Sequence, residues 1–374
     1  MELTEKQEQG LKIAIERYNK KEKYTCISGY AGSGKSTLIK FIVNSLGLKN
    51  YQVSYIAYTG KAALVLKEKG CPNAQTAHKL LYQSYPKKEG GFIHIPRKTI
   101  SNYKLIVVDE VSMLPNEMWE LLLSHKIHVI ALGDPGQLPP VSGECEILKN
   151  PHIFLDEIMR QAQESEIIRL TMDIREGKPL QLYSGKEVQI IDKKDVVSGM
   201  FLWADKIICA KNQTRNKIND LVRQYKFNAK NREPVEGDEV ICLRNYWQEP
   251  SESGDVLVNG LVGTISNIRY FKNEMIADFT PDGNEKFDYF ENLKVDYNLL
   301  TKGEETLVNN KNKKILPLKQ FDYGYCITAW KAQGSEYDNV LVFEEDFPFN
   351  KEDHIKYLYT ACTRSRKKLV IVRK

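Results

Sequence analysis

A glycine-rich segment near the N-terminus constrains the fold more than any other feature of the sequence. The segment GYAGSGKST (29–37) follows a β-rich run (24–28) and precedes helix-forming residues near 35–45. Strand, glycine-rich turn and helix in this order let backbone N–H groups wrap around a phosphate, because glycines place no Cβ in the way. Lys35 would add a positive charge at the β- and γ-phosphates, and the Ser36 hydroxyl would bind Mg²⁺. The segment therefore predicts a site for ATP and Mg²⁺, whereas a plain glycine turn before a helix would need neither side chain.

An acidic segment downstream supplies the partner of this site. Asp109 and Glu110 end the apolar run of IVVDEVSM (106–113). Asp109 would hold Mg²⁺ through its coordination shell, and Glu110 would orient or deprotonate the attacking water. Two acids at a strand end are more often a helix cap or a solvated loop, but the upstream phosphate-binding segment favours the functional interpretation. The predicted nucleotide- and metal-binding residues so far are Gly29, Gly32, Ser33, Gly34, Lys35, Ser36, Thr37 and Asp109.

The first 178 residues alternate β-rich runs with helical stretches, which predicts a parallel sheet covered on both faces. The expected strands lie at 24–28, 51–57, 104–109 and 127–132, and the expected helices near 35–45, 60–69, 76–82 and 115–124. The segment 83–100 contains two prolines and a Gly-Gly step, so we expect a small β-hairpin there.

A second α/β unit follows and is interrupted. We expect strands at 205–210 and 238–243 around a helix at 212–226, and, later, strands at 323–328, 339–343 and 368–373 with a helix near 353–364. Between them the turn-rich stretch 247–319 indicates a small all-β insert. The predicted organisation is a first core at 1–178, a second core at 179–246 and 320–374, and the insert at 247–319.

Composition limits the class of protein. The chain has 374 residues, 42% of them hydrophobic and 28% charged, with a net charge of +5 that only mildly favours a polyanionic partner. Seven cysteines are scattered without a CxxC pair, and four of them lie in apolar runs that we expect to be strands: Cys26, Cys209, Cys242 and Cys326. These four indicate small buried side chains in a reducing compartment, not disulfides or zinc ligands. The N-terminus lacks the apolar core of a signal peptide and no stretch is long enough to span a membrane, so we expect a soluble cytoplasmic protein.

Gln7 has two interpretations, and the residue types alone favour neither. Thr4 and Gln7 have the spacing of a helix capping box. A glutamine upstream of a phosphate-binding segment could instead bind the edge of adenine.

Several further motifs occur together in one order. They are AYTGKAAL (57–64), TAHKLLY (76–82), ALGDPGQLPPV (131–141), IMRQAQESEIIRL (158–170), TAWKAQGSEYDNVLV (328–342) and YTACTRSRKKLVIV (359–372). In identity, spacing and order this set resembles superfamily 1B helicases of the RecD-like and Dda-like kind. The resemblance implies an α/β fold of two RecA-like parallel-sheet cores, with a small β-hairpin insert in the first and an SH3-like insert in the second. It also implies ATP-dependent 5′→3′ translocation on single-stranded DNA and unwinding of DNA at single-strand/duplex junctions. The motor unit would be a monomer, with replication or repair proteins as possible partners.

The resemblance assigns roles around the nucleotide. Gln7 would contact adenine, Gln137 would sense the γ-phosphate, and Glu336 would lie near the ribose. Arg160 and Arg364 would reach the γ-phosphate from across the cleft between the cores, where a planar guanidinium suits the charge that builds during phosphoryl transfer. An isolated arginine would more often form a surface salt bridge, and Arg366, two residues on, is assigned a structural role.

The resemblance also assigns a nucleic-acid track. Its residues are Thr59, Lys61, Thr76 and His78 in the first core, Phe92 in a strand-separating hairpin, and Thr328, Trp330 and Lys331 in the second core. Taken singly, Thr76 is explained by a helix cap and His78 by ordinary packing. Relatives usually carry histidine where this chain has Trp330, whose indole either stacks on a base or has turned into the core.

Other functions stay open. The motor motifs do not separate an RNA-directed helicase from a DNA helicase, because both share the phosphate path. A DNA-stimulated ATPase that loads or remodels other proteins would carry the same motifs without unwinding duplexes. A small-molecule kinase leaves the second core unexplained.

Overall fold

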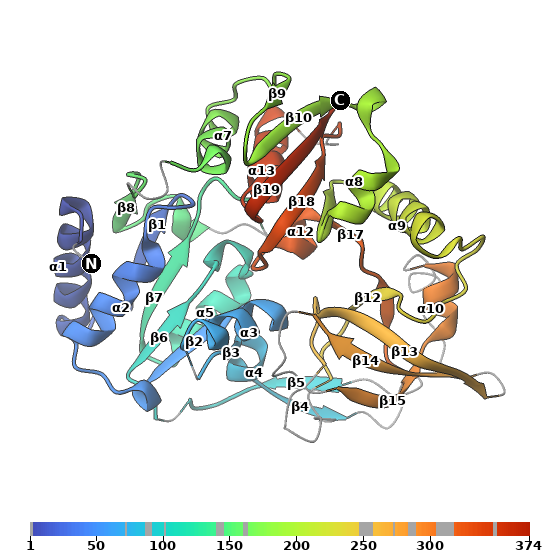
Figure 1. Cartoon of the computed structure of the whole chain (residues 1–374). Coiled ribbons are helices and arrows are strands. Elements are labelled where there is room, and N and C mark those ends of the chain that lie inside the picture. Colours follow the sequence, from blue (N-terminus) through green and yellow to red (C-terminus); the bar gives the residue numbers. More distant parts are fainter. Residues whose placement is uncertain are drawn as a thin grey trace.

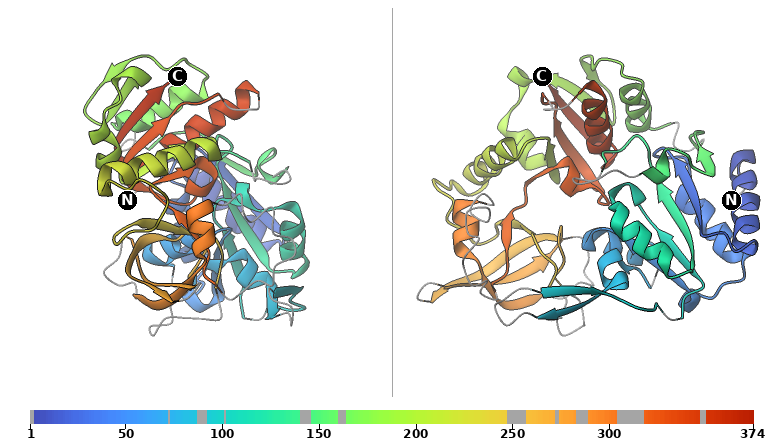
Figure 2. Two further views of the ribbon diagram at one scale, coloured as in Figure 1. Left: turned by 90° about the vertical axis from the view of Figure 1, so that its right-hand side faces the viewer. Right: turned by 180° about the vertical axis from the view of Figure 1, so that it is seen from behind.

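The structure is a computed structural model in which the three largest β-sheets occupy three corners of the molecule (Figure 1, Figure 2). It describes residues 3–71, 73–86, 92–100, 102–139, 146–159, 164–246, 257–271, 274–282, 289–303, 318–346 and 350–374. Two of the sheets are six-stranded, and the third has five strands.

The first sheet is parallel throughout and has the order β3-β2-β6-β7-β1-β8. Its strands are β1 (Tyr24–Gly29), β2 (Val53–Ala57), β3 (Gln75–Thr76), β6 (Leu105–Val108), β7 (His128–Gly133) and β8 (Ile153–Leu155). Alternate residues of β6 enter different cores: Leu105 and Val107 join the cluster beneath α1 (Glu5–Asn19) and α2 (Lys35–Ser45), whereas Ile106 and Val108 join the cluster beneath α4 (Ala77–Leu81) and α5 (Asn116–Ser124). The prediction of a parallel sheet covered on both faces is confirmed.

The second sheet has the order β17-β11-β18-β19-β10-β9, with parallel pairing except at its edge strand β9. Its strands are β9 (Tyr183–Ser184), β10 (Val188–Asp192), β11 (Lys206–Cys209), β17 (Cys326–Thr328), β18 (Tyr337–Phe343) and β19 (Ser365–Arg373). The helices α7 (Glu166–Arg175), α12 (Ala329–Ala332) and α13 (Lys351–Cys362) contribute to the cluster on one face. The helices α8 (Ser198–Trp203) and α9 (Asn212–Phe227) contribute to the cluster on the other.

The third sheet is antiparallel and corrects two expectations. Its order is β15-β14-β13-β12-β16, with strands β12 (Glu239–Cys242), β13 (Val262–Phe271), β14 (Glu274–Pro281), β15 (Phe290–Val295) and β16 (Phe321–Tyr323). We expected 238–243 to continue the second α/β unit, and this was wrong, because β12 pairs with β13 and β16. The expected single strand at 323–328 is divided, with β16 in this sheet and β17 in the second sheet. A short, continuous apolar run fits a buried strand of either kind of sheet, so periodicity could not decide.

One hydrophobic cluster joins the third sheet to the second. It contains Ile207 and Leu341 of the second sheet together with Phe279 and Phe321 of the third. A buried ion pair between Arg223 of α9 and Asp238, with Nε at 2.9 Å from Oδ1, lies beside the start of β12. The third sheet is therefore packed to the second core as one unit.

The segment that leads into β13 contacts the first core at the start of α3 (Gly60–Glu68). A Cβ built on Gly60 would lie 2.1 Å from the Cβ of Val258, so glycine leaves room for the Val258 side chain.

The predicted hairpin is present as β4 (Tyr82–Pro86) paired antiparallel with β5 (Phe92–Pro96). Tyr85, Ile93 and Ile95 are exposed on it. Within the described part of the chain, no helix has the length and apolar character to cross a membrane. The four cysteines expected in strands, Cys26, Cys209, Cys242 and Cys326, are buried there.

Candidate functional site

The glycine-rich segment forms the turn between β1 and α2. Gly34 caps α2 in the left-handed region, with φ of 81°, and a Cβ there would lie 2.3 Å from Nε2 of Gln7. Lys35 Nζ donates to the carbonyl oxygens of Gly29 at 2.6 Å and Tyr30 at 3.0 Å, so its ammonium lies over the turn. The turn thus presents a helix N-terminus and one cation, the arrangement that binds a phosphate.

This turn opens into a cavity of about 340 Å³ between the two cores. Both Lys35 of the first core and Arg364 of the second line it, which places them at one site as the sequence predicts. Its charged lining residues are Lys35, Lys69, Asp109, Glu110, Asp134, Glu336 and Arg364. Four carboxylates against three cations suit a cavity that takes a divalent cation together with an anion.

The predicted metal residues Ser36 and Asp109 line this cavity together. Asp109 Oδ1 accepts a hydrogen bond from the Glu110 N–H at 3.1 Å, and burial raises the pKa of Asp109 while Lys35 opposes the rise. No group of three or more His, Cys, Asp or Glu side chains that could hold a metal occurs among the residues described. A hydroxyl and one carboxylate nevertheless fit Mg²⁺, which keeps several waters and takes further oxygens from phosphates.

Glu110 has an unusual backbone and an open side chain. Its φ is 48°, in the left-handed region that non-glycine residues rarely adopt. Its Oε2 is buried without a hydrogen-bond partner in the described structure. Burial raises the pKa of Glu110, and Arg364 opposes the rise. A carboxylate with a raised pKa and an unused oxygen can accept a proton from a water.

Burial lowers the pKa of Lys35, whereas Asp134, Asp109 and Glu110 oppose that shift. The three carboxylates therefore help to keep the ammonium charged inside the cavity.

Arg364 is held by its own core and points across the cavity. Its Nε donates to the Thr360 carbonyl at 3.1 Å and its Nη1 to the Ser335 carbonyl at 3.4 Å. Nη1 also lies 3.5 Å from Oε1 of Glu110 in the first core. The guanidinium is thus positioned in advance, and only 6% of the residue is exposed.

A second link between the cores was missed by the sequence reasoning. The Tyr359 hydroxyl of α13 donates to Oδ2 of Asp134 at 2.8 Å and accepts from the Ala31 N–H of the glycine-rich segment at 2.9 Å. Both residues lie inside quoted motifs, GDPGQ and YTACTRSR, and the signal in the sequence was an acid, Asp134, to which no role had been assigned.

The remaining nucleotide predictions are placed as follows. Gln7 makes the full capping box, since its Oε1 accepts from the Thr4 N–H at 3.0 Å. Its Nε2 donates to the Ser33 carbonyl at 3.2 Å, so the same side chain also braces the phosphate-binding turn. Gln137 lines the cavity, and Glu336 lines it while paired with Lys69 at 3.3 Å. Arg160 lies outside the described residues.

Four of the predicted nucleic-acid residues line one smaller cavity of about 180 Å³. They are Thr59, Lys61, Trp330 and Lys331. Trp330 Nε1 donates to the Pro139 carbonyl at 3.1 Å. The cavity also receives Asn259 and Gly260 of the insert, so all three parts of the molecule meet there.

The other residues predicted to contact nucleic acid do not line this cavity. Thr76 is 1% exposed and its hydroxyl accepts from the Lys79 N–H at 3.2 Å, which confirms the helix-cap interpretation. His78 lies between the rings of Tyr58 and Tyr82, with centroids 5.8 Å from each, and burial lowers its pKa. Thr328 is buried at the start of α12. Phe92 belongs to β5, and its side chain lies outside the described part of the structure.

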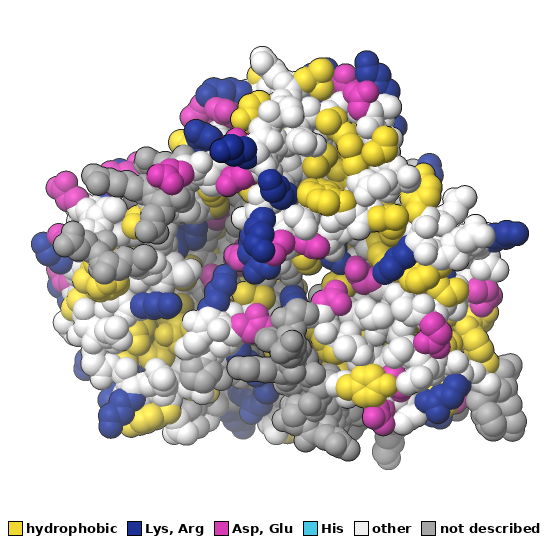
Figure 3. Space-filling model, in the orientation of Figure 1, with side chains coloured by type: hydrophobic (Ala, Val, Ile, Leu, Met, Phe, Trp, Pro, Cys, Tyr) yellow, Lys and Arg dark blue, Asp and Glu magenta, His cyan; other side chains and the backbone are white. Residues whose placement is uncertain are grey.

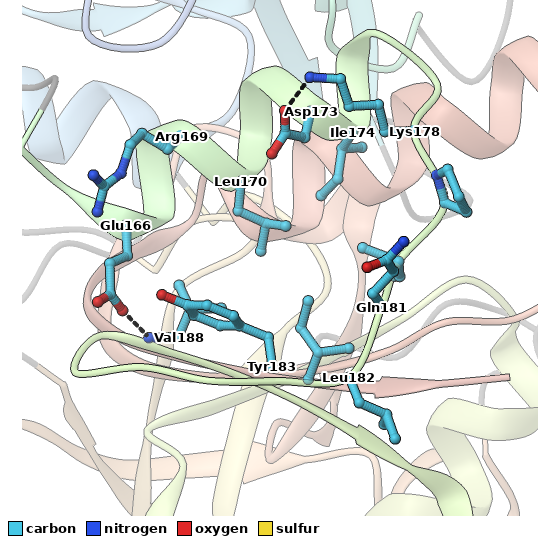
Figure 4. A pocket seen from close by; sticks show the side chains of 13 residues that line it. Glu166, Arg169, Leu170, Asp173, Ile174, Lys178, Gln181, Leu182, Tyr183 and Val188 are labelled. Carbon is cyan, nitrogen blue, oxygen red and sulfur yellow. Dashed lines mark hydrogen bonds and ion pairs between the residues drawn. The ribbon is translucent and has the colours of Figure 1, made fainter.

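A larger cavity of about 660 Å³ lies elsewhere, between α7 and the β9–β10 edge (Figure 4). Its acids are already used: Glu166 accepts from the Glu187 N–H at 2.9 Å, and Asp173 pairs with Lys178 at 2.6 Å. Unlike the nucleotide cavity it lacks a glycine-rich turn, and the Glu166 N–H at the start of α7 already donates to Glu187 at 2.9 Å, so we assign no catalysis to it. The space-filling view shows Lys and Arg side chains mixed with acids along the middle of the molecule, where the cores meet (Figure 3).

Fold and site together define a P-loop protein with a cavity between two RecA-like cores, lined by Lys35 from one core and Arg364 from the other. Comparison with known families agrees: residues 2–199 match the AAA domain model, and residues 323–372 match the UvrD-like helicase C-terminal domain. The chain therefore belongs to the AAA domain family, and the second match is consistent with the resemblance to superfamily 1B helicases of the RecD-like and Dda-like kind.

Two of the curated relatives carry helicase names. The chain is 35% identical over 162 residues to the ATP-dependent RecD2 DNA helicase of Deinococcus radiodurans, which covers 41% of this chain and 22% of that protein. It is 28% identical over 191 residues to the ATP-dependent DNA helicase dda of Enterobacteria phage T4. That match covers 47% of this chain and 43% of the phage protein. The chain thus spans less than half the length of either relative.

A solved structure shares the fold. It is a Pif1 helicase from Bacteroides in complex with ADP-AlF3 and ssDNA, with a TM-score of 0.57 and 19% identity over 100% of this chain and 92% of that one.

Proposed function

We propose that the protein is an ATP-dependent 5′→3′ translocase on single-stranded DNA and a DNA helicase. The observation that carries the proposal is the cavity between the cores, which Lys35 lines from one side and Arg364 from the other. A nucleotide held by both cores makes their separation depend on its hydrolysis, and such opening and closing becomes stepping when each core also holds the strand.

The side chains divide the hydrolysis step among them. Lys35 and the N–H groups of the glycine-rich turn would bind the β- and γ-phosphates, and Gln137 would sense the γ-phosphate. Ser36 and Asp109 would hold Mg²⁺, which neutralises phosphate charge when bound. Glu110, with its raised pKa and unused oxygen, would take the proton of the attacking water. Arg364 would stabilise the charge that develops on the transferred phosphoryl group, with Arg160 as a second cation.

Hydrogen bonds between the cores give the coupling a route. Gln333 Nε2 donates to the Leu138 carbonyl at 3.0 Å and Trp330 Nε1 to the Pro139 carbonyl at 3.1 Å. Thr360 Oγ1 accepts from the Leu138 N–H at 2.9 Å. These contacts adjoin Gln137, so a change at the γ-phosphate would reach α12 and the proposed strand-binding surface directly.

The relatives support DNA as the partner, whereas the 5′→3′ polarity is what the resemblance to superfamily 1B helicases implies. Both named relatives are DNA helicases, and the structural neighbour holds single-stranded DNA. Single-strand/duplex junctions would meet the β4–β5 hairpin, with Phe92 as the predicted separating side chain. We take the monomer as the motor unit, with cores at 1–178 and at 179–246 with 320–374, and with replication or repair proteins as partners. The SH3-like insert at 247–319 shares its sheet with β12 and β16 from the flanking segments.

Unwinding assays test the proposal. With ATP and Mg²⁺, duplexes with a 5′ tail should be separated, whereas those with a 3′ tail or no tail should not. Comparison of ATP hydrolysis on poly(dT) and poly(U) tests the RNA alternative, since a DNA motor should respond to the first. Strong stimulation by poly(dT) without any unwinding would instead indicate a loading or remodelling ATPase.

A further inference from the structure

The small cavity of about 180 Å³ has a composition unlike a phosphate site. Met113, Pro115 and Tyr58 line it together with Trp330, so most of its wall is apolar. It is smaller than the roughly 300 Å³ at which cavities for drug-sized molecules begin. Its size and walls suit one flat, largely apolar ring system.

One polar atom beside the cavity lacks a partner. Gln333 is 1% exposed and lines the cavity. Its Nε2 donates to the Leu138 carbonyl at 3.0 Å, which fixes the orientation of the amide. Its Oε1 is then a buried acceptor without a hydrogen-bond partner in the described residues. A buried acceptor of this kind is costly unless a donor satisfies it.

Trp330 supplies an aromatic wall of known orientation. Its indole N–H is directed to the Pro139 carbonyl at 3.1 Å, and the residue is partly buried against the cluster that holds α12 and α13. The two interpretations of Trp330 are therefore compatible, because one part of the side chain packs while another lines the cavity.

We propose that this cavity binds one unstacked nucleobase of the single strand, with Trp330 against the ring face and Gln333 Oε1 accepting from an N–H on the base edge. The inference rests on the proposed function and adds the manner in which the strand is held. All four bases carry an N–H on their pairing edge, so the cavity accepts any of them, as a translocase requires. Lys61 and Lys331 line the same cavity and would bind the adjoining phosphates.

The site also links base occupancy to the nucleotide. Trp330 and Gln333 donate to the consecutive carbonyls of Pro139 and Leu138, and Gln137 precedes Leu138 in the nucleotide cavity. A base seated against Trp330 stabilises the arrangement in which the two cores are joined by these bonds. Bases, and not phosphates alone, therefore stimulate hydrolysis.

Abasic DNA separates the contribution of the bases from that of the phosphates. Binding of a fluorescent oligothymidylate should be compared with that of an oligomer of equal length whose bases are removed, and ATP hydrolysis measured with each. The protein should bind the oligothymidylate about tenfold more tightly, since stacking on an aromatic side chain contributes that much per base. When a single abasic position is moved along the oligomer, one position should weaken binding most.

Variants locate the effect. In Trp330→Leu the affinity for the oligothymidylate should fall toward that for the abasic oligomer, whose own affinity stays unchanged. The matched control is Trp203→Leu, which removes an exposed tryptophan on α8 and should keep the full preference. Equal affinity of the parent protein for both oligomers, or a full preference in Trp330→Leu, would overturn the inference while leaving the motor proposal intact. Failure of the oligothymidylate to bind or to stimulate hydrolysis would instead overturn the motor proposal itself.

Discussion

Replacement of Arg364 by alanine should abolish most ATP turnover while leaving ATP bound. Nη1 of Arg364 lies 3.5 Å from Glu110 across the nucleotide cavity, and its anchors are carbonyls of its own core. A unit charge at such a distance contributes about 5 kcal/mol at an effective dielectric constant of 20. Most of this interaction energy should be gained only as charge develops on the phosphoryl group in the transition state. Loss of the arginine should therefore lower kcat about 10³-fold.

The assay is steady-state ATP hydrolysis with saturating oligothymidylate, together with binding of a fluorescent ATP analogue. Arg364→Lys should recover only part of the rate, because a lysine keeps the charge but lacks the planar fork and the Nε donor to Thr360. Arg366→Ala is the matched control, since Arg366 is exposed and pairs with Asp338 at 2.7 Å on the surface. A kcat within tenfold of the parent in Arg364→Ala, or an equal loss in Arg366→Ala, would refute the assignment.

Three further perturbations test other parts of the structure. Lys35→Ala should abolish hydrolysis and leave single-strand affinity largely unchanged in an anisotropy titration; normal turnover would contradict the phosphate site. Gly60→Ala should lower the unfolding free energy by about 1–3 kcal/mol in a denaturant titration, because its Cβ would meet Val258 at 2.1 Å. Its control is Gly199→Ala, whose Cβ meets nothing within 4 Å, and equal effects would remove the close approach as the cause. Burial lowers the pKa of His128, so the unfolded state binds the proton first, and stability should fall as pH drops below about 6.5. His128→Gln should reduce that fall in the melting temperature, and an unchanged pH profile would show that another group is responsible.

The sequence by itself determined the local architecture of the site. Strand, glycine-rich turn and helix are set by neighbouring residues, so the turn at 29–37 and the acids at 109–110 were found where expected. The hairpin of β4 and β5 was also expected, because prolines and a Gly-Gly step exclude a helix there. Such features depend on backbone geometry within about ten residues of one another.

Tertiary structure decided which segments share a sheet and which side chains share a cavity. Nothing within the run 239–242 distinguishes a parallel core strand from an antiparallel insert strand, and only pairing with 321–323 and 262–264 settled it. Likewise Tyr359 meets Asp134 across 225 residues of chain, and Trp330 meets Pro139 across 191. A hydrogen bond between distant residues leaves no periodic trace in either segment, because its geometry exists only after both cores have folded and met.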